Sequence, residues 1–586
     1  MQLKPVIFQA LSIFFAKLLR LSLPAVMLVA WSCANRVPPT GGPKDKKPPK
    51  LLHSVPTTGD RNFRGRLLAL EFDEYIQANK FKDQLIITPR INGSYTYKIR
   101  KRTVLIEFDS AFAPNTTYTL NFREAIVDIT EKNPARDLVI AFSTGDHLDT
   151  LTLSGQVNDL LTDLPAKEVT VGLYPEDDTL DIFSGQPYYF TRTNKGGHYE
   201  FGYLKQGRYR LYAFADQNKN LTCQSRNEPY GFLPEPVTID TNTVADTLYL
   251  VQLNIDSLKI TRTRSSGRYY LVSANKYITD TRLQAANDST LYYRYTDNHK
   301  TLKFYKTFDI PDSLAVYASL SDSAGFVVQD TFYLQFPETN RRPDEFKVNY
   351  SKPHASKTYR YLKGSVNFSK PLLHINPDSI YIRYDSLEFY PLKELINLQY
   401  DTANLKLSYL SSIPPAIFDS LEQRKKRLQN KNMNKTTTGA GRDLSTLKGK
   451  SSGRYQLVFG SGVFLSVEQD TSEVNSQELK FTDASQFALL TGKVITNQPS
   501  YLIQLLDNKY KVVQEVRNER EYTFKEIPPG EYMLRVLIDS NGNGRWDAGN
   551  ILLNQLPEPV RIYHDEAGNR KTALRANWDV QIDLQF

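Results

Sequence analysis

The stretch Asp539-Ser-Asn-Gly-Asn-Gly-Arg-Trp-Asp547, followed by Leu556-Pro-Glu-Pro-Val560, decides how this chain divides into domains. A second copy lies upstream as Asp216-Gln-Asn-Lys-Asn220, followed by Leu233-Pro-Glu-Pro-Val237. In both copies the Leu follows the first Asp by 17 positions (539 to 556 and 216 to 233). Because so many matches recur in one order, the sequence predicts that one module occurs twice.

The match continues toward the N-terminus of each copy, where Leu490-Thr-Gly-Lys-Val494 corresponds to Leu153-Ser-Gly-Gln-Val157. The remaining pairs are Tyr199 and Tyr522, Phe201 and Phe524, Leu204 and Ile527, Gly207 and Gly530, Tyr209 and Tyr532, and Leu211 and Leu534. Alternate side chains of a strand face the core, so the Tyr and Leu of the last two pairs should point inward together. Asp216 and Asp539 should then occupy equivalent loops. The prolines of the Leu-Pro-Glu-Pro-Val segments place them at a sheet edge or a bend.

Length and composition indicate several β-rich domains. A single core stops growing at about 250–300 residues, and this chain has 586. The 36 Tyr and 30 Phe residues, with frequent Thr, Gly and Pro, favour strands over helices. The net charge is +9, and the 73 basic residues are spread among nearly as many acidic ones, 64. Nucleic acid is therefore not an expected partner.

The first 33 residues are typical of an export signal. Lys4, Lys17 and Arg20 precede the apolar run Leu21–Trp31, which is shorter than the roughly 20 residues that span a bilayer. The run ends just before Cys33, and this arrangement resembles a bacterial lipoprotein signal. The resemblance implies that Cys33 is acylated and becomes the mature N-terminus. The alternative is an ordinary signal peptide with an incidental cysteine.

The cysteine count agrees with a lipid anchor. The chain has two cysteines, so an acylated Cys33 leaves Cys223 without a disulfide partner. We expect Cys223 to be a small buried apolar residue and not a nucleophile. Residues 34–50 are rich in Pro, Gly and Lys, which predicts an extended tether between the membrane and the first domain.

Residues 51–147 show short alternating runs separated by turn signals, which is typical of a β-sandwich; one such run is Leu68, Leu70 and Phe72. A further set of motifs is Phe72-Asp-Glu-Tyr-Ile76, Pro114-Asn-Thr-Thr-Tyr-Thr-Leu120, Ile126-Val-Asp128 and Phe142-Ser-Thr-Gly145. This set resembles the bacterial Ig-like domain named for the S-layer protein SbsA. Together with Ser32–Asn35 and Gly41–Asp45, the segment resembles Bacteroidetes lipoproteins that begin with such a domain. The resemblance implies an exported, non-enzymatic surface or periplasmic protein.

The rest of the chain divides into four segments. Residues 151–252 and 488–586 are the two repeat copies, and their Gly-x-Tyr strand after a Phe-x-x-Leu segment resembles transthyretin-like or carboxypeptidase-regulatory-like modules. These modules serve as spacers and stiffeners in exported proteins. Residues 253–337 and 346–482 are interpreted as divergent Ig-like domains. The expected fold class is therefore all-β, with tandem Ig-like and transthyretin-like β-sandwich domains.

We call residues 253–337 the third segment and residues 346–482 the fourth segment. A basic insertion, residues 420–453, interrupts the fourth segment. It holds the run Glu422-Gln-Arg-Lys-Lys-Arg-Leu-Gln-Asn-Lys-Asn432 and lacks the apolar residues whose burial would offset the entropy of ordering. It is predicted to be disordered. One interpretation is a basic patch for an acidic polysaccharide, lipid headgroups or a partner. The other is a solvated loop, which is the commoner state of a charge run.

Asp539, Asn541, Asn543, Arg545 and Asp547 follow the spacing of a calcium loop. Asp and Asn oxygens suit a hard cation, and Arg545 would supply its backbone carbonyl. Asn550 stands at position 12, where a Glu is usual, and the upstream copy has Leu221 and Gln224 in place of Gly544 and Asp547. A weak calcium site is therefore predicted in the downstream copy alone. The alternative is a loop whose Asn and Asp side chains cap their own backbone.

The sequence carries no recognisable catalytic signature. Its seven histidines show no zinc spacing, and no Gly-x-Ser-x-Gly motif occurs. We therefore expect a non-enzymatic protein that requires no cofactor, calcium aside. The function indicated is a lipid-anchored scaffold or binding and adhesion module of the outer membrane, facing the periplasm or the surface. Its expected partners are the membrane, through the lipid, and an envelope protein or glycan. The alternative is a carbohydrate-active enzyme or an accessory subunit of a glycan-processing complex.

Overall fold

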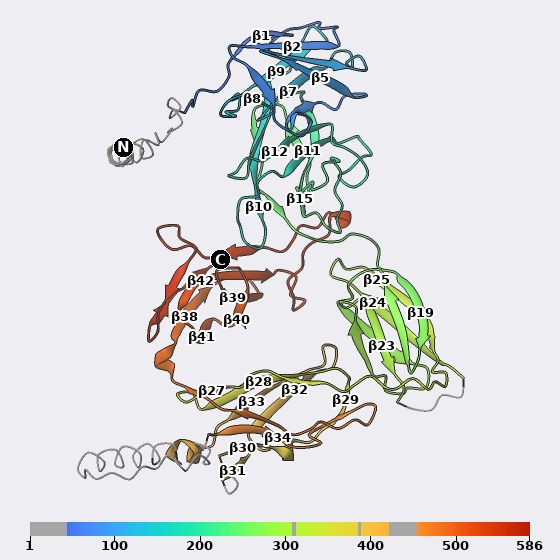
Figure 1. Cartoon of the computed structure of the whole chain (residues 1–586), viewed down its shortest axis with the longest axis vertical. Coiled ribbons are helices and arrows are strands. Elements are labelled where there is room, and N and C mark those ends of the chain that lie inside the picture. The colour runs from blue at the N-terminus through green and yellow to red at the C-terminus, as the bar shows by residue number, and fades with distance from the viewer. Residues whose placement is uncertain (1–43, 308–311, 385–387, 421–422, 424–453) are drawn as a thin grey trace, which may run out of the picture. The chain divides into compact units, whose positions relative to one another are not determined.

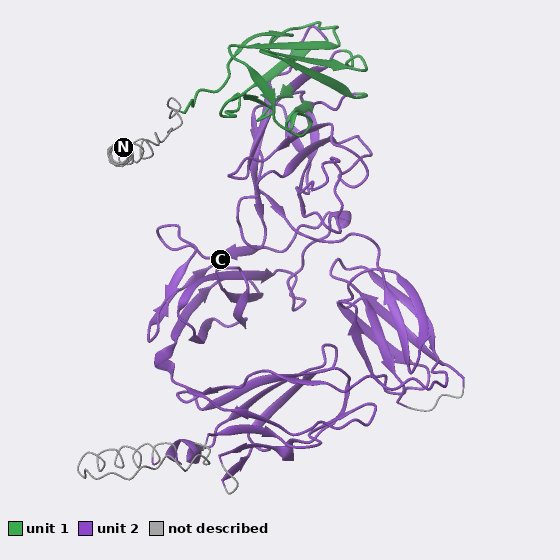
Figure 2. Ribbon diagram, viewed as in Figure 1, with its two compact units in different colours: residues 1–87, 92–114, 120–144 green, residues 88–91, 115–119, 145–586 purple. Residues whose placement is uncertain are grey.

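The structure is a computed structural model that describes residues 44–307, 312–384, 388–420, 423 and 454–586 (Figure 1). The predicted signal peptide, Cys33 and the start of the tether lie outside the described residues, as does nearly all of the predicted insertion. Nearly all of the regular secondary structure in the described residues is β-strand, which confirms the predicted all-β class. No described helix has the length and apolar character needed to cross a membrane. The chain divides into two compact units (Figure 2): residues up to 87, 92–114 and 120–144, and residues 88–91, 115–119 and 145–586.

The N-terminal strands form a four-stranded sheet in the order β1-β2-β6-β5, a three-stranded sheet β4-β7-β9 and the pair β3-β8. Leu68, Leu70 and Phe72 of β2 are buried while their neighbours are more exposed, as the alternation predicted. The Phe142 ring packs edge-on against the Phe112 ring at 5.2 Å. The elements are β1 (Leu51–Val55), β2 (Leu67–Phe72), β3 (Ile76–Ala78), α2 (Phe81–Gln84), β4 (Ile86–Thr88), β5 (Tyr95–Arg100), β6 (Thr103–Phe108), β7 (Thr117–Asn121), β8 (Ile126–Asp128) and β9 (Val139–Ser143).

The first repeat module, residues 151–252, is a sandwich of two sheets. One sheet has the order β13-β10-β17, with β18 also on β10, and the other has the order β12-β11-β14-β15, with β16 also on β14. Leu153 of β10 and Leu173 of β11 share one core, so the two sheets pack face to face. The strands are β10 (Leu151–Asp159), β11 (Thr170–Pro175), β12 (Tyr189–Arg192), β13 (His198–Leu204), β14 (Gly207–Phe214), β15 (Tyr230–Phe232), β16 (Val237–Ile239), β17 (Thr243–Val244) and β18 (Leu248–Leu250).

The second repeat module, residues 488–586, has the same strand order. Its sheets run β41-β38-β45, with β46 also on β38, and β40-β39-β42-β43, with β44 also on β42. Leu153 pairs with Phe201 just as Leu490 pairs with Phe524. The inward-facing Tyr and Leu of β14 and β42 all lie in the cores, as predicted. The elements are β38 (Ala488–Ile495), β39 (Ser500–Leu506), β40 (Val512–Arg517), β41 (Glu521–Ile527), β42 (Gly530–Asp539), η3 (Ile551–Leu553), β43 (Val560–Ile562), β44 (Thr572–Leu574), β45 (Asp579–Gln581) and β46 (Leu584–Gln585).

The two Leu-Pro-Glu-Pro-Val segments are not equivalent in the fold, and that part of the sequence match is wrong. Leu556–Val560 leads into β43, the edge strand of its sheet, whose counterpart is β15. Leu233–Val237 instead leads into β16, whose counterpart is β44. The second module carries a longer loop after β42, so the equal spacing of 17 positions is a coincidence. The counterpart of Glu558 is therefore Glu228 and not Glu235.

The third and fourth segments are also sandwiches, each with one shared core. The third, residues 258–336, pairs the sheet β19-β20-β23-β22 with the sheet β21-β24-β25. The fourth comprises residues 346–482. Its first sheet has the order β32-β33-β28-β27-β37, and β26 also pairs with β28. Its other strands form the sheet β31-β30-β34-β36 and the pair β29-β35. Strands of the third segment are β19 (Ile260–Ser266), β20 (Tyr269–Ala274), β21 (Asp280–Ala285), β22 (Tyr293–Thr296), β23 (Thr301–Tyr305), β24 (Leu314–Ser321) and β25 (Val327–Leu334). Elements of the fourth are β26 (Val348–Tyr350), β27 (His354–Ser356), β28 (Tyr361–Phe368), β29 (Leu372–Ile375), η1 (Pro377–Ser379), β30 (Ile380–Arg383), β31 (Phe389–Pro391), β32 (Ile396–Asp401), β33 (Lys406–Ser412), β34 (Gln456–Phe459), β35 (Phe464–Ser466), β36 (Asn475–Glu478) and β37 (Phe481–Thr482); η2 (Ala484–Gln486) precedes the last module.

Cys223 is buried in the first repeat module and carries a free thiol. It packs in a cluster with Tyr174, Phe214 and Tyr230. Burial raises the pKa of the Cys223 thiol well above its ordinary value. A thiol that stays protonated is a poor nucleophile, so the residue has the packing role that the sequence predicted.

Candidate functional site

The residues of the predicted calcium loop come together after β42. The Asp539 carboxylate accepts the N–H groups of Asn543 and Gly544 over 3.1 and 2.9 Å. The amide groups of Asn541 and Asn543 both donate to Asp547, over 2.7 and 2.6 Å. The Arg545 guanidinium lies 3.3 Å from Asp547. The five predicted residues thus share one tight loop.

The loop satisfies many of its polar groups internally. The Asn541 and Asn543 side-chain oxygens accept backbone N–H groups two residues on, each over 2.9 Å. Such bonds are the self-capping pattern that was the alternative to calcium. Within the described residues, no group of three or more His, Cys, Asp or Glu side chains lies close enough to hold a metal ion. The loop contributes only the carboxylates of Asp539 and Asp547, and its binding of calcium stays a prediction.

A glutamate outside the predicted set closes each repeat loop. Glu558 accepts the N–H groups of Ser540 and Asp547 over 2.7 and 2.8 Å, and it also accepts the N–H of Asn541 over 3.1 Å. In the first module Glu228 accepts two N–H groups at the equivalent places, those of Gln217 and Gln224, over 2.8 and 2.7 Å. Both glutamates are buried. The sequence match hid this pair because it aligned Glu558 with Glu235.

The two equivalent aspartates differ in their pKa values. Burial tends to raise the pKa of Asp539, but hydrogen bonds from the Ser500 hydroxyl and from the backbone N–H groups of Gly544 and Asn543 hold it below its usual value. For Asp216, burial outweighs the two N–H groups that it accepts, and its pKa is raised. Asp539 has additional donors in the Ser500 hydroxyl and the Gly542 N–H, whereas burial and the nearby Glu228 carboxylate raise the pKa of Asp216.

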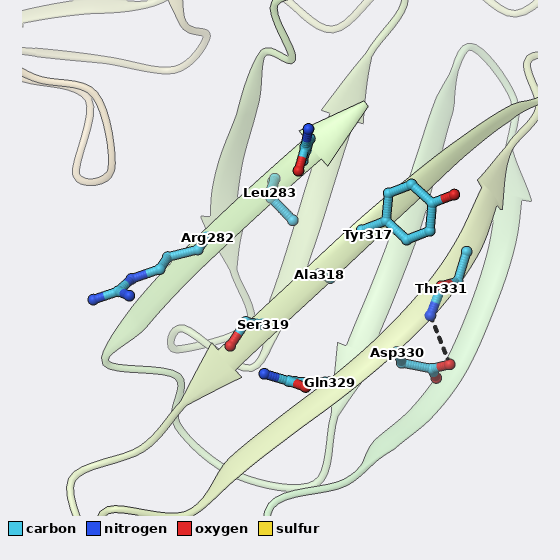
Figure 3. A pocket seen from close by; sticks show the side chains of 9 residues that line it. Arg282, Leu283, Tyr317, Ala318, Ser319, Gln329, Asp330 and Thr331 are labelled. Atoms are coloured by element: carbon cyan, nitrogen blue, oxygen red, sulfur yellow. Dashed lines mark hydrogen bonds between the residues drawn. The ribbon is translucent and has the colours of Figure 1, made fainter. Parts of the chain in front are cut away.

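A different surface, the outer face of the sheet β21-β24-β25, is a candidate for ligand binding (Figure 3). The inner face of this sheet packs on the core of the third segment through residues such as Val316, Leu320 and Phe332. A strand places alternate side chains on opposite faces, so the intervening residues point to solvent. They surround an open hollow of about 580 Å³.

Strand pairing orders these outward side chains into two rows. Arg282 of β21, Ser319 of β24 and Gln329 of β25 form the first row. The second row consists of Gln284, Tyr317 and Thr331. Each row spans three strands, about 10 Å at ~4.8 Å per strand, and the rows lie about 7 Å apart along the strands. We call these six residues the open face. Figure 3 shows Arg282, Tyr317 and Gln329 projecting from three neighbouring strands.

The open face combines an aromatic ring with planar polar groups. Tyr317 is 54% exposed, and Tyr333, diagonally placed on β25, is 56% exposed. Arg282 and Gln284 add a guanidinium and an amide that can donate hydrogen bonds. Tyrosine and arginine are enriched where proteins recognise ligands, because each offers a flat apolar body and a polar end.

The sequence contains a signal for this surface, although no motif marks it. In β24 and β25, one parity holds Tyr317, Ser319, Gln329, Thr331 and Tyr333, with Ala315 and Val327 as its apolar members, and the other parity is apolar apart from Asp330. Period-2 alternation predicts a half-buried strand. It does not show that the three solvent-facing sets lie side by side, because this depends on strand order and register.

The family model described as the bacterial Ig-like domain matches residues 45–144. That match agrees with the Ig-like resemblance of the N-terminal motifs. No curated protein matches the chain.

Several solved structures are similar to the chain at low identity. The major pilin subunit BcpA of Bacillus cereus is 10% identical, covering 75% of this chain and 99% of that one at a TM-score of 0.11. Domains 1–6 of the surface layer protein SbsC are 8% identical, covering 89% and 67% at a TM-score of 0.13. The T6 backbone pilin of Streptococcus pyogenes is 9% identical, covering 71% and 80% at a TM-score of 0.11. These TM-scores establish no common arrangement of domains.

Proposed function

We propose that this protein is a non-catalytic binding scaffold of the cell envelope, and that its open face binds an extended polysaccharide. The observation that carries the proposal is the pair of rows on the sheet β21-β24-β25, with Tyr317 at the centre. In this scheme acylated Cys33 anchors the chain in the outer membrane. The first repeat module, which lies between Cys33 and the open face in the chain, acts as a transthyretin-like spacer that holds the open face away from the membrane.

The chemistry of the open face suits a carbohydrate chain. One side of a pyranose ring is lined with C–H groups and can lie on an exposed tyrosine ring, while its hydroxyls need partners that donate and accept. Gln284 and Gln329 do both, and Arg282 donates. The open shape of the hollow fits a long chain that passes over the sheet better than a small molecule, which proteins usually enclose.

The positions of the carboxylates favour binding over glycan cleavage. Asp280 and Asp330 are the acidic residues of the two outer strands near this surface. Their places in the strand register put their backbones roughly 14 Å apart, and Asp330 has the parity of the inward-facing residues. Glycosidases hold their two carboxyl groups about 5–9.5 Å apart on either side of one bond. An accessory binding role in a glycan-processing complex agrees with the same observation.

Affinity electrophoresis of the full chain in gels cast with a neutral or an acidic polysaccharide, guided by a glycan array, tests the proposal. Tyr317→Ala should weaken binding at least about tenfold, which corresponds to ~1.4 kcal/mol. Tyr75→Ala is the matched control, because Tyr75 is 53% exposed but lies elsewhere. Equal retardation of both variants would disprove a role for the open face. Release of shorter sugars by the wild type would favour the alternative function, a carbohydrate-active enzyme.

The lipid anchor has its own test. Labelled palmitate should enter the wild-type protein and should be absent from Cys33→Ala, which should also leave the membrane fraction. A protein that keeps the label after this substitution would show that Cys33 is not the anchor. Sugar binding by the open face does not depend on this result, so the two parts of the proposal can fail separately.

A further inference from the structure

Lys370 is a lysine without exposed side-chain surface in the fourth segment. It lies between β28 and β29, and its Nζ is 2.6 Å from Asp470 Oδ2 and 2.8 Å from Glu468 Oε2. Removing an amine and its partners from water is costly unless the groups contact each other closely. The fold has therefore placed one amine between two carboxyl groups in a site with little water.

The two acids belong to a turn after β35 that Ser466 organises. The buried Ser466 hydroxyl donates to Asp470 Oδ2 over 2.8 Å and accepts the N–H groups of Glu468 and Asp470 over 3.2 and 3.1 Å. Glu468 also accepts a hydrogen bond from the Tyr269 hydroxyl over 3.2 Å, and the Arg268 guanidinium lies 3.6 Å away. Each carboxyl group is thus held in place independently of Lys370.

We propose that Lys370 and Asp470 condense into an intramolecular amide bond, with Glu468 carrying the protons. The Lys370 Nζ attacks Asp470 Cγ, so an Nζ–Cγ bond forms and one Cγ–Oδ bond breaks. Two of the three ammonium protons end on the departing oxygen, which leaves as water, and the third remains on the amide nitrogen. The net change is the loss of one water, and no oxidant, metal or cofactor takes part.

The arrangement is that of a reactant pair. At an ordinary hydrogen-bond angle, an oxygen 2.6 Å from Nζ puts Cγ about 3.4 Å from Nζ, within the ~3–3.5 Å of a near-attack geometry. Burial lowers the pKa of Lys370, but its contacts with Asp470 and Glu468 raise it more, so the starting state is an ion pair. A base must therefore remove a proton before attack, and Glu468 is in direct contact. The Asp470 side chain is 36% exposed, which gives the released water a way out.

The bond would tie together two points that are 100 positions apart in the chain. The predicted basic insertion, which lies outside the described residues, falls between them. Cross-links restrict the unfolded chain more strongly as the enclosed loop lengthens. The fourth segment would thus remain one covalent body even after a protease cuts the insertion.

Intact-mass spectrometry of the denatured full chain tests the proposal. The wild type should be lighter than its own sequence mass by one water, whereas Glu468→Gln, which keeps both reacting groups but lacks the proton carrier, should have its full sequence mass. A tryptic map should contain one branched peptide joining Lys370 to Asp470. Lys370→Arg should have its full mass, and Asp470→Asn should lose ammonia instead of water.

A wild-type chain with its full sequence mass and no branched peptide would overturn the proposal, whether or not the variants fold. A second readout is a denaturing gel after brief trypsin treatment of the native protein, with cleavage inside the basic insertion confirmed by fragment sequencing. The wild-type fragments should migrate together and those of Glu468→Gln should separate. Separation of the wild-type fragments would also overturn the proposal.

Discussion

The two repeat modules share their strand order and their loop bonds, yet they have diverged in the residues around the loop. In both modules an aspartate at the end of a central strand accepts N–H groups four and five positions on. In both, a buried glutamate fastens the two ends of the loop. The glutamate follows Asp216 by 12 positions (216 to 228) and Asp539 by 19 (539 to 558). What is kept is the set of bonds and not the spacing.

Loss of the loop glutamate should have the largest effect. Glu558→Ala leaves three part-buried N–H donors without their acceptor and should destabilise the second module by up to about 3 kcal/mol, since each hydrogen bond contributes roughly 1 kcal/mol. Glu228→Ala removes two such bonds and should cost about 2 kcal/mol. Native-state hydrogen exchange of each module in the full chain measures both, because a multi-domain chain does not unfold in two states.

Glu235→Ala is the matched control, because Glu235 is exposed and aligns with Glu558 by sequence alone. It should change stability by less than about 0.5 kcal/mol. If Glu235→Ala instead weakened the first module as much as Glu228→Ala, the equivalence derived from strand register would be wrong and the sequence alignment right.

The two modules show which features of the fold the sequence can predict and which it cannot. The repeated Gly-x-Tyr-x-Leu strand predicted β14 and β42 and their inward side chains, because alternation is a local property. The loop glutamates could not be matched from the sequence, because a longer loop shifted one of them while an unrelated Leu-Pro-Glu-Pro segment kept the spacing. The open face and the Lys370 site were missed for a similar reason. Both join residues from strands whose order and register the sequence does not reveal.

Calcium binding should give the next largest difference in stability between the two modules. The second loop offers Asp547 and Gly544 where the first has Gln224 and Leu221, so only the second should respond. With a dissociation constant near 10⁻³ M, about 10 mM calcium should stabilise it by ~1.4 kcal/mol. The measurement is amide protection of each loop with and without calcium, with Asp547→Ala as the control. Equal protection with and without the ion would leave self-capping as the whole role of the loop.

The Ser500 hydroxyl should account for a smaller part of the difference. It donates to Asp539, whereas the register of β11 places Glu168 at the equivalent position. Ser500→Ala should destabilise the second module by about 1 kcal/mol, the typical net contribution of one hydrogen bond. Ser500→Thr keeps the hydroxyl and suits a strand, so it should behave as the wild type. If both variants were equally unstable, packing and not the hydroxyl would be responsible.

Acid should move the two loops in opposite directions, by less than about 1 kcal/mol each. The pKa of Asp539 is lowered in the fold, so its contribution is present above the unfolded value near 3.9 and is lost as the pH falls through the folded value. The pKa of Asp216 is raised, so its ionised form is disfavoured in the fold, and protonation between the raised value and about 3.9 relieves that cost.

On acidification from pH 6 to below 4, protection of the Leu221 amide should therefore rise relative to that of Gly544, after correction for intrinsic exchange rates. In Ser500→Ala the pKa of Asp539 should rise toward that of Asp216, and the two loops should become more alike. Parallel loss of protection in both wild-type loops would show that their aspartates titrate alike, and that the additional hydroxyl does not separate them.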